Sequence, residues 1–273
     1  MNPTSNIRQK GVFLLPNALT TGGLFAGFFS IISGINGQYS AAAIAIIVAG
    51  VLDGLDGRVA RLTNTQSDFG VQYDSLADMV SFGLAPALLV FNWSLQSLGQ
   101  YGSFGSKLGW LAAFVYVACA ALRLARFNAQ VGQVDRSYFQ GLASPAAAGT
   151  VAVTVWFFVD QGVSGEAVRS LIWLETVTLG LLMFSRVRYF SFKTFPRGEK
   201  VPLAWLFLLV LAIVLLSLDP PSVGLVLAVA YVVSGIVMTL LGRRNRQARR
   251  LLKKRRQDAN ARRLRQDPPA DLQ

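Results

Sequence analysis

The sequence contains no histidine and a single cysteine, Cys119, among its 273 residues. Without histidine, imidazole metal sites, histidine general bases and Ser-His-Asp triads are all excluded. One cysteine excludes an intrachain disulfide and a cysteine metal cluster, and its apolar surroundings predict a packing residue. Any catalysis therefore depends on carboxylates, hydroxyls, lysine or arginine, and bound cations.

Charged residues are also scarce, at 15% of the chain, where a soluble domain has about a quarter. Hydrophobic residues make up 53% of the chain, and they gather in blocks of about 17–25 residues, the length that crosses a bilayer. This composition excludes a soluble globular protein and a disordered chain. We predict an all-α polytopic membrane bundle with eight transmembrane helices, at 18–35, 40–62, 75–97, 108–127, 143–159, 166–185, 202–218 and 222–241.

Positive charge is unevenly distributed in this chain, which has 26 lysines and arginines against 14 acids. Eight spans place both termini on one side, and all of the basic residues except Lys107 and Arg169 fall on that side. Because basic loops stay in the cytoplasm, both termini are predicted to be cytoplasmic. The basic tail, residues 243–273, is expected to lie on anionic membrane lipids, and no nucleic-acid partner is expected.

Acids gather at the expected cytoplasmic ends of the second and third spans. Asp53 and Asp56 are separated by three positions and Asp74 and Asp78 by four, so each pair occupies one helix face. If the two helices form a hairpin, four carboxylates converge, and such like charges require a cation. Ligation by oxygen alone favours Mg²⁺, Mn²⁺ or Ca²⁺, and two such ions balance four carboxylates.

Small and basic residues follow these acids. Gly57 and Ala60 keep the helix backbone accessible to a ligand, and Arg61 offers a guanidinium fork for phosphate oxygens. For the glycines taken alone, close helix packing is the favoured explanation.

The acids and their neighbours have the order D-x-x-D-G-x-x-A-R, eight residues, G, three residues, D, three residues, D. This order resembles the signature of the CDP-alcohol phosphatidyltransferase family, here Asp53, Asp56, Gly57, Ala60, Arg61, Gly70, Asp74 and Asp78. The resemblance implies that an alcohol cleaves a CDP-linked lipid at its pyrophosphate with the help of two divalent cations, Mg²⁺ or Mn²⁺. It also implies that Asp53, Asp56 and Asp74 are metal ligands, and that Asp78 is both a ligand and the general base.

Five further segments resemble the serine-using branch of that family: PNALTTGG (16–23), SFGLAP (81–86), RLARFN (123–128), GLASPAAA (141–148) and LMFSRVRYFSFK (182–193). One departure is Ala143, where that branch is expected to have proline. The resemblance implies transfer of the phosphatidyl group from CDP-diacylglycerol to L-serine, giving phosphatidylserine and CMP, in a homodimer.

Serine carries a carboxylate, which arginine is suited to bind. Arg123 and Arg126 share one helix face beside Asn128, so they could bind serine, clamp the CDP phosphates or anchor the helix at the membrane surface. Asn17 and Thr20, near the start of the first span, are candidates for nucleotide contact or for helix capping.

The expected organisation is a cytoplasmic N-terminal segment (1–15), a catalytic helix bundle (16–200), two further spans (201–242) and the basic tail (243–273). The expected location is a bacterial-type inner membrane, with the active site facing the cytoplasm. Two alternatives remain: the same chemistry with glycerol phosphate, inositol phosphate or choline as acceptor, and a membrane transporter, since intramembrane acids often mark transport paths.

Overall fold

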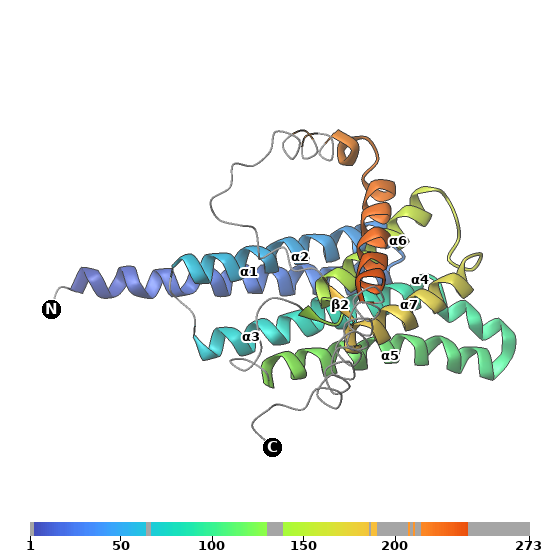
Figure 1. The fold of residues 1–273 in the computed structure, drawn as a ribbon, viewed down its shortest axis with the longest axis horizontal. Coiled ribbons are helices and arrows are strands. Elements are labelled where there is room, and N and C mark those ends of the chain that lie inside the picture. The colour runs from blue at the N-terminus through green and yellow to red at the C-terminus, as the bar shows by residue number, and fades with distance from the viewer. Residues whose placement is uncertain are drawn as a thin grey trace, which may run out of the picture.

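A computed structural model describes residues 3–63, 67–129, 139–185, 187–189, 207, 210 and 214–239. Most of the described helices lie side by side along one axis (Figure 1). The elements are α1 (Pro3–Ile35), α2 (Tyr39–Leu62), α3 (Asp68–Asp78), the π-helix η1 (Met79–Leu84), α4 (Ala85–Trp93), the 3₁₀-helix η2 (Leu95–Tyr101), α5 (Gly102–Ala129), β1 (Phe139–Gln140), α6 (Ser144–Asp160), α7 (Arg169–Phe184) and β2 (Arg188–Tyr189). The two short strands pair antiparallel, and the fold class is all-α.

Five of the described helices are long and apolar enough to cross a membrane: Pro16–Ile35, Tyr39–Leu62, Asp68–Trp93, Leu95–Ala129 and Pro220–Thr239. They cover the predicted spans one to four and eight. The fifth and sixth predicted spans are helices α6 and α7, with 17 and 16 residues. The predicted span at 202–218 lies largely outside the described residues. The protein is therefore a helical membrane bundle, and the count of eight spans stays a prediction.

Several helix boundaries differ from those of the predicted spans. The first helix begins at Pro3, although its candidate membrane span, Pro16–Ile35, agrees with the predicted 18–35. The third begins at Asp68 rather than 75 and ends at Trp93 rather than 97, where a 3₁₀ turn follows. The early start of α3 has a local cause, because the Ser67 hydroxyl accepts a hydrogen bond from the Gly70 amide at 3.0 Å. Such an N-cap satisfies an amide that a helix start otherwise leaves unpaired.

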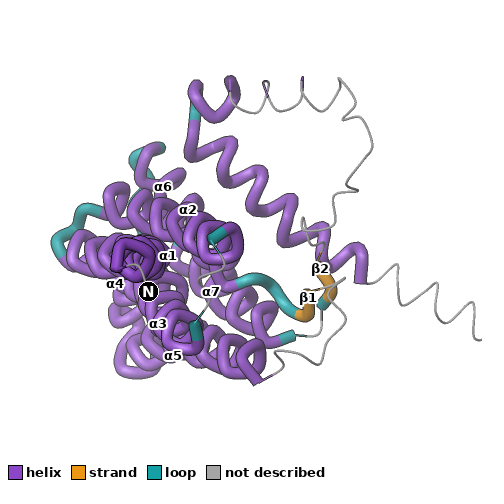
Figure 2. Tube along the Cα trace, turned by 90° about the vertical axis from the view of Figure 1, so that its left-hand side faces the viewer, coloured by secondary structure: helices purple, strands orange, loops and turns teal. Residues whose placement is uncertain are grey.

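The last described helix, Pro220–Thr239, which we name the C-terminal helix, lies crosswise to the bundle (Figure 1). Figure 2 shows it along one flank, next to the two strands. Glycine allows it to approach closely, because a Cβ at Gly235 would collide with the ring of Tyr189. Tyr231 of this helix also packs on Tyr189, with ring centroids 5.5 Å apart. The predicted span at 222–241 thus corresponds to a long apolar helix, Pro220–Thr239, that packs against the strand β2.

Helices α1 and α2 form an antiparallel hairpin with the most extensive contact in the described bundle. The turn between them uses Gly37, whose positive φ of 76° suits glycine. Four alanines of α2 are buried, Ala42, Ala43, Ala45 and Ala49. Such small side chains allow the two backbones to approach closely in a membrane. This hairpin brings the start of the first span level with the aspartates of α2.

A π-helical turn, η1, directly follows Asp78 and interrupts the third span. The Ser81 hydroxyl, 2% exposed, donates a hydrogen bond to the Gly23 carbonyl of α1 at 3.0 Å. A Cβ at Gly27 would lie 2.8 Å from the Ser81 Cα, so α1 and η1 touch backbone to backbone. From α5, the Tyr116 hydroxyl donates to the Phe82 carbonyl at 3.3 Å. Two helices thus hold the turn that follows Asp78, and π turns are common at functional sites.

We predict that Gly27→Ala lowers the free energy of unfolding by about 1–3 kcal/mol, because the new methyl group forces α1 away from Ser81. Gly149→Ala is the matched control, since no atom of the described part of the chain outside its own helix backbone lies within 4 Å of the position its Cβ would take. That control should leave stability unchanged or raise it by up to about 1 kcal/mol. Thermal unfolding in detergent measures both. Equal stability of the two variants would contradict the close contact of α1 with η1.

Candidate active site and metal centre

All four signature aspartates line one small pocket between α1, α2 and the third span. The other lining residues are Thr20, Gly23, Ala49, Ala77, Ser81 and Phe82. The hairpin of α1 and α2 supplies one wall, and α3 with η1 supplies the other. The helix-face argument from the sequence therefore agrees with where these side chains lie.

Three of the aspartates form a tight cluster. One carboxylate oxygen from each of Asp53, Asp56 and Asp74 lies within 4.8 Å of the other two. Asp56 is buried and the other two are partly buried. Asp78 lines the same pocket but is not a member of this group of three, and its charge interacts with all of them. Because the donors are carboxylates alone, the cluster fits a hard divalent cation.

Thr20 holds one member of the cluster in place. Its hydroxyl lies 2.8 Å from Oδ2 of Asp56, to which it donates, and 3.1 Å from the Pro16 carbonyl. Thr20 is only 6% exposed. Sequence reasoning offered this residue as a nucleotide contact or a helix cap, and the structure adds a further role. It orients a metal-ligand candidate, as residues behind metal ligands often do.

The remaining motif residues lie outside the pocket lining. Arg61 is exposed, and its Nε donates to the Gly57 carbonyl one turn earlier at 2.7 Å. Ala60, which lies between these two residues in sequence, is partly buried. A Cβ at Gly70 would lie 3.5 Å from Oδ1 of Asn17, so these two residues meet where α1 contacts α3. These four signature residues and Asn17 thus lie beyond the acids, toward the connection between α2 and α3.

The three candidates on α5 have different surroundings. Arg123 donates from Nη1 to the Ser144 hydroxyl of α6 at 2.8 Å, and its charge interacts with Asp78. Asn128 donates from Nδ2 to the Ser75 hydroxyl at 3.0 Å, which ties the end of α5 to α3. Arg126 is partly buried and is not among the pocket-lining residues. The charge of Arg123 thus acts on an aspartate of the pocket.

Sequence reasoning missed an intramembrane acid away from the four aspartates. Glu175 of α7 is partly buried, and its Oε1 accepts a hydrogen bond from the Thr154 hydroxyl of α6 at 2.8 Å. An acid inside an apolar helix was the available signal, because such a residue is costly and needs a partner. Ser81 and Ser144 were also missed as supports of the site, although both lie in segments that resembled a known family.

A model of the CDP-alcohol phosphatidyltransferase family matches residues 13–182. The chain belongs to this family, and the family is metal-dependent in general. Among its relatives are two proteins named CDP-diacylglycerol–serine O-phosphatidyltransferase. The one from Helicobacter pylori is 36% identical over 230 residues, which is 84% of this chain and 92% of the relative. The one from Methanocaldococcus jannaschii is 33% identical over 192 residues, which is 70% of this chain and 81% of the relative.

A further relative carries a different name. The archaetidylserine synthase of Methanothermobacter thermautotrophicus is 34% identical over 177 residues, or 64% of this chain and 69% of the relative. The names of all three relatives include serine, although the third differs in the lipid named. The names of these relatives therefore agree on serine and differ in the lipid.

We predict that Thr20→Val, which keeps the side-chain shape but removes the hydroxyl, weakens Mn²⁺ binding by about 10-fold or more. The cause is that Asp56 loses the donor that fixes its carboxylate. Thr21→Val is the control, because the Thr21 hydroxyl contacts the Asn17 carbonyl and the Tyr73 hydroxyl rather than an acid. Titration of the purified variants with Mn²⁺, followed by electron paramagnetic resonance, measures both affinities. Unchanged affinity in Thr20→Val would contradict the role of Thr20.

Proposed function

We propose that this protein transfers the phosphatidyl group of CDP-diacylglycerol to the hydroxyl of L-serine, giving phosphatidylserine and CMP. The observation that carries the proposal is the meeting of all four signature aspartates in one pocket. The family match gives the reaction class, and the names of the relatives favour serine as the acceptor. An integral membrane bundle suits an enzyme whose donor substrate is a lipid.

Two divalent cations, Mg²⁺ or Mn²⁺, are proposed to be held by Asp53, Asp56, Asp74 and Asp78. Support comes from the 4.8 Å cluster of carboxylate oxygens and from the lack of histidine in the chain. Bound ions of this kind neutralise negative charge on the pyrophosphate and on the departing CMP phosphate. By holding these cations, the four carboxylates would also fix the position of the reacting phosphorus. Such positioning is most of what phosphoryl transfer requires of a protein.

Asp78 is the proposed general base. It lies outside the three-carboxylate cluster, at the end of α3, and the braced π turn follows it directly. Its carboxylate takes the proton of the serine hydroxyl, and the serine oxygen forms a bond to the phosphatidyl phosphorus. The bond from that phosphorus to the bridging oxygen breaks, and CMP leaves with the electron pair. Direct displacement needs no covalent intermediate.

Binding of the CDP-lipid is proposed to involve Asn17, Thr20, Gly57, Ala60, Arg61 and Gly70. Arg61 is exposed at the end of α2, where its guanidinium can reach phosphate oxygens. Among the described residues, no atom outside the backbone of α2 lies within 4 Å of a Cβ built at Gly54, so this side of α2 leaves room for a ligand. Arg126 and Asn128 are proposed contacts for serine or for phosphate at the end of α5.

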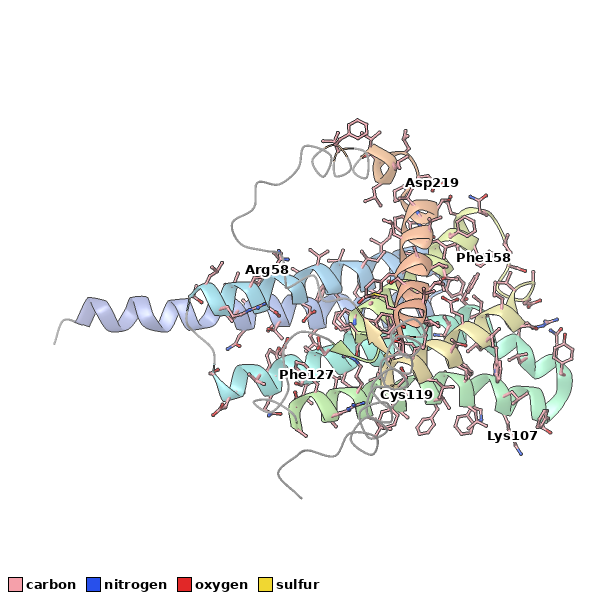
Figure 3. All side chains as sticks on the ribbon, viewed as in Figure 1. Arg58, Lys107, Cys119, Phe127, Phe158 and Asp219 are labelled. Carbon is pink, nitrogen blue, oxygen red and sulfur yellow. The ribbon has the colours of Figure 1, made fainter. Side chains whose placement is uncertain are left out.

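The acids are proposed to face the cytoplasm of a bacterial-type inner membrane, with both termini on that side. Arg58, close to the acids in sequence, and Lys107, predicted on the other side, lie toward opposite ends of the bundle (Figure 3). The proposed protein is a homodimer with eight spans in each chain, and its tail contacts anionic lipids. Its proposed parts are residues 1–15, 16–200, 201–242 and 243–273.

An acceptor panel tests the proposed function. Purified protein with CDP-diacylglycerol and Mn²⁺ should release CMP at least about 10-fold faster with L-serine than with glycerol phosphate, inositol phosphate or choline. Chelation by EDTA should stop release, since the carboxylates alone cannot neutralise the pyrophosphate. Asp78→Asn is the control for catalysis in the pocket and should be inactive. Faster release with another acceptor would replace serine, and full activity in EDTA would contradict the mechanism.

A further inference from the structure

Arg123 has an unsatisfied donor in a buried place. Its Nη1 is bonded to Ser144, but its Nε is buried and has no hydrogen-bond partner among the described residues. A buried N–H of a charged group costs free energy unless something accepts its hydrogen bond. Such a group in a native site points to an acceptor that binds there. An anionic ligand at the Arg123 guanidinium would satisfy it.

The position of Arg123 separates two possible anions. Among the acids of the pocket, its charge interacts with Asp78, the proposed base. A pyrophosphate must lie against that cluster, whereas the acceptor hydroxyl must lie at Asp78. Arg123 interacts through charge with Asp78, and its buried Nε has no hydrogen-bond partner among the described residues, so an anion bound at Arg123 would lie on the Asp78 side of the pocket. This geometry favours the acceptor over the phosphates.

We infer that Arg123 binds the carboxylate of the acceptor, so that a small hydroxy acid spans from Arg123 to Asp78. The inference rests on the proposed function and names the group by which the enzyme recognises serine. Arginine matches a carboxylate with two parallel N–H donors, and the buried Nε is one of the two that such a pair uses. Acceptors without a carboxylate, such as choline, would leave the guanidinium unpaired.

The C-terminal helix contributes to the same place. Tyr231 interacts with the charge of Arg123, and its ring packs on Tyr189. Arg123 therefore lies among Ser144 of α6, Asp78 of the third span and Tyr231 of the C-terminal helix. The family model stops at residue 182, whereas the match to the Helicobacter pylori relative spans 84% of the chain and must extend beyond it. A segment outside the shared family region thus borders the acceptor side of the site.

The experiment compares L-serine with L-serinamide, in which an uncharged amide replaces the carboxylate. Arg123→Gln should raise KM for L-serine by about 10- to 100-fold, the effect of losing a charged hydrogen bond. KM for L-serinamide and KM for CDP-diacylglycerol should each change by less than about twofold, because neither uses the lost contact. Arg169→Gln, an arginine bonded to Tyr101 and predicted on the other side of the membrane, is the matched control and should leave all three values unchanged.

Opposite results would overturn the inference. An equal rise for L-serine and L-serinamide, or a rise for CDP-diacylglycerol alone, would place Arg123 at the phosphates. If Arg123→Gln does not fold, Ser144→Ala removes the acceptor of Nη1 and should raise KM for L-serine alone by about 3- to 5-fold. Unmodified protein that uses the amide as well as serine would also contradict the inference. Failure of the proposed function looks different, because unmodified protein would then make no phosphatidylserine.

Discussion

Mutual repulsion of four aspartates inside two membrane helices is the constraint on which the rest of the site depends. Each carboxylate near the centre of a membrane helix costs about 2.5–3.5 kcal/mol, and like charges a few ångströms apart add to this cost. The cluster of Asp53, Asp56 and Asp74 is therefore stable as a set of anions only with cations bound. The hydroxyl of Thr20 offers a neutral donor, and Arg123 is the positive charge that acts on Asp78.

Helix α1 provides the supports that hold this arrangement. Thr20 fixes Asp56 of α2, and two turns further along the helix Gly27 allows the π turn after Asp78 to touch the α1 backbone. The small side chains of α1 and α2 therefore serve close packing and catalytic geometry together. A metal site on rigid, closely packed helices holds its ligands more exactly in place than one on loops, which phosphoryl transfer requires.

The acids could be placed from sequence because helix geometry alone fixes their faces. Separations of three and four residues put each pair of acids on one side of its helix. The second and third spans follow each other closely in sequence, which predicts that their acid-bearing ends lie at the same membrane surface. The bonds from Thr20 to Asp56 and from Ser81 to Gly23 join residues 36 and 58 positions apart, and no local pattern indicates such partners. The early start of α3 had a local signal in Ser67, but a search for apolar runs passes over the polar turn that follows it. The crosswise C-terminal helix depends on packing between Gly235 and Tyr189, which hydropathy does not report.

Counting the bound metal ions tests the central claim most directly. Purified protein saturated with Mn²⁺ is predicted to hold two ions per chain, and Asp56→Asn, which removes a buried charge from the cluster, should lose at least one of them. Asp160→Asn, an exposed acid outside the pocket, should keep both. Saturable binding of two ions in the unmodified chain and in Asp160→Asn, with fewer in Asp56→Asn, is the predicted result. No saturable binding, or the same count in all three proteins, would contradict the account.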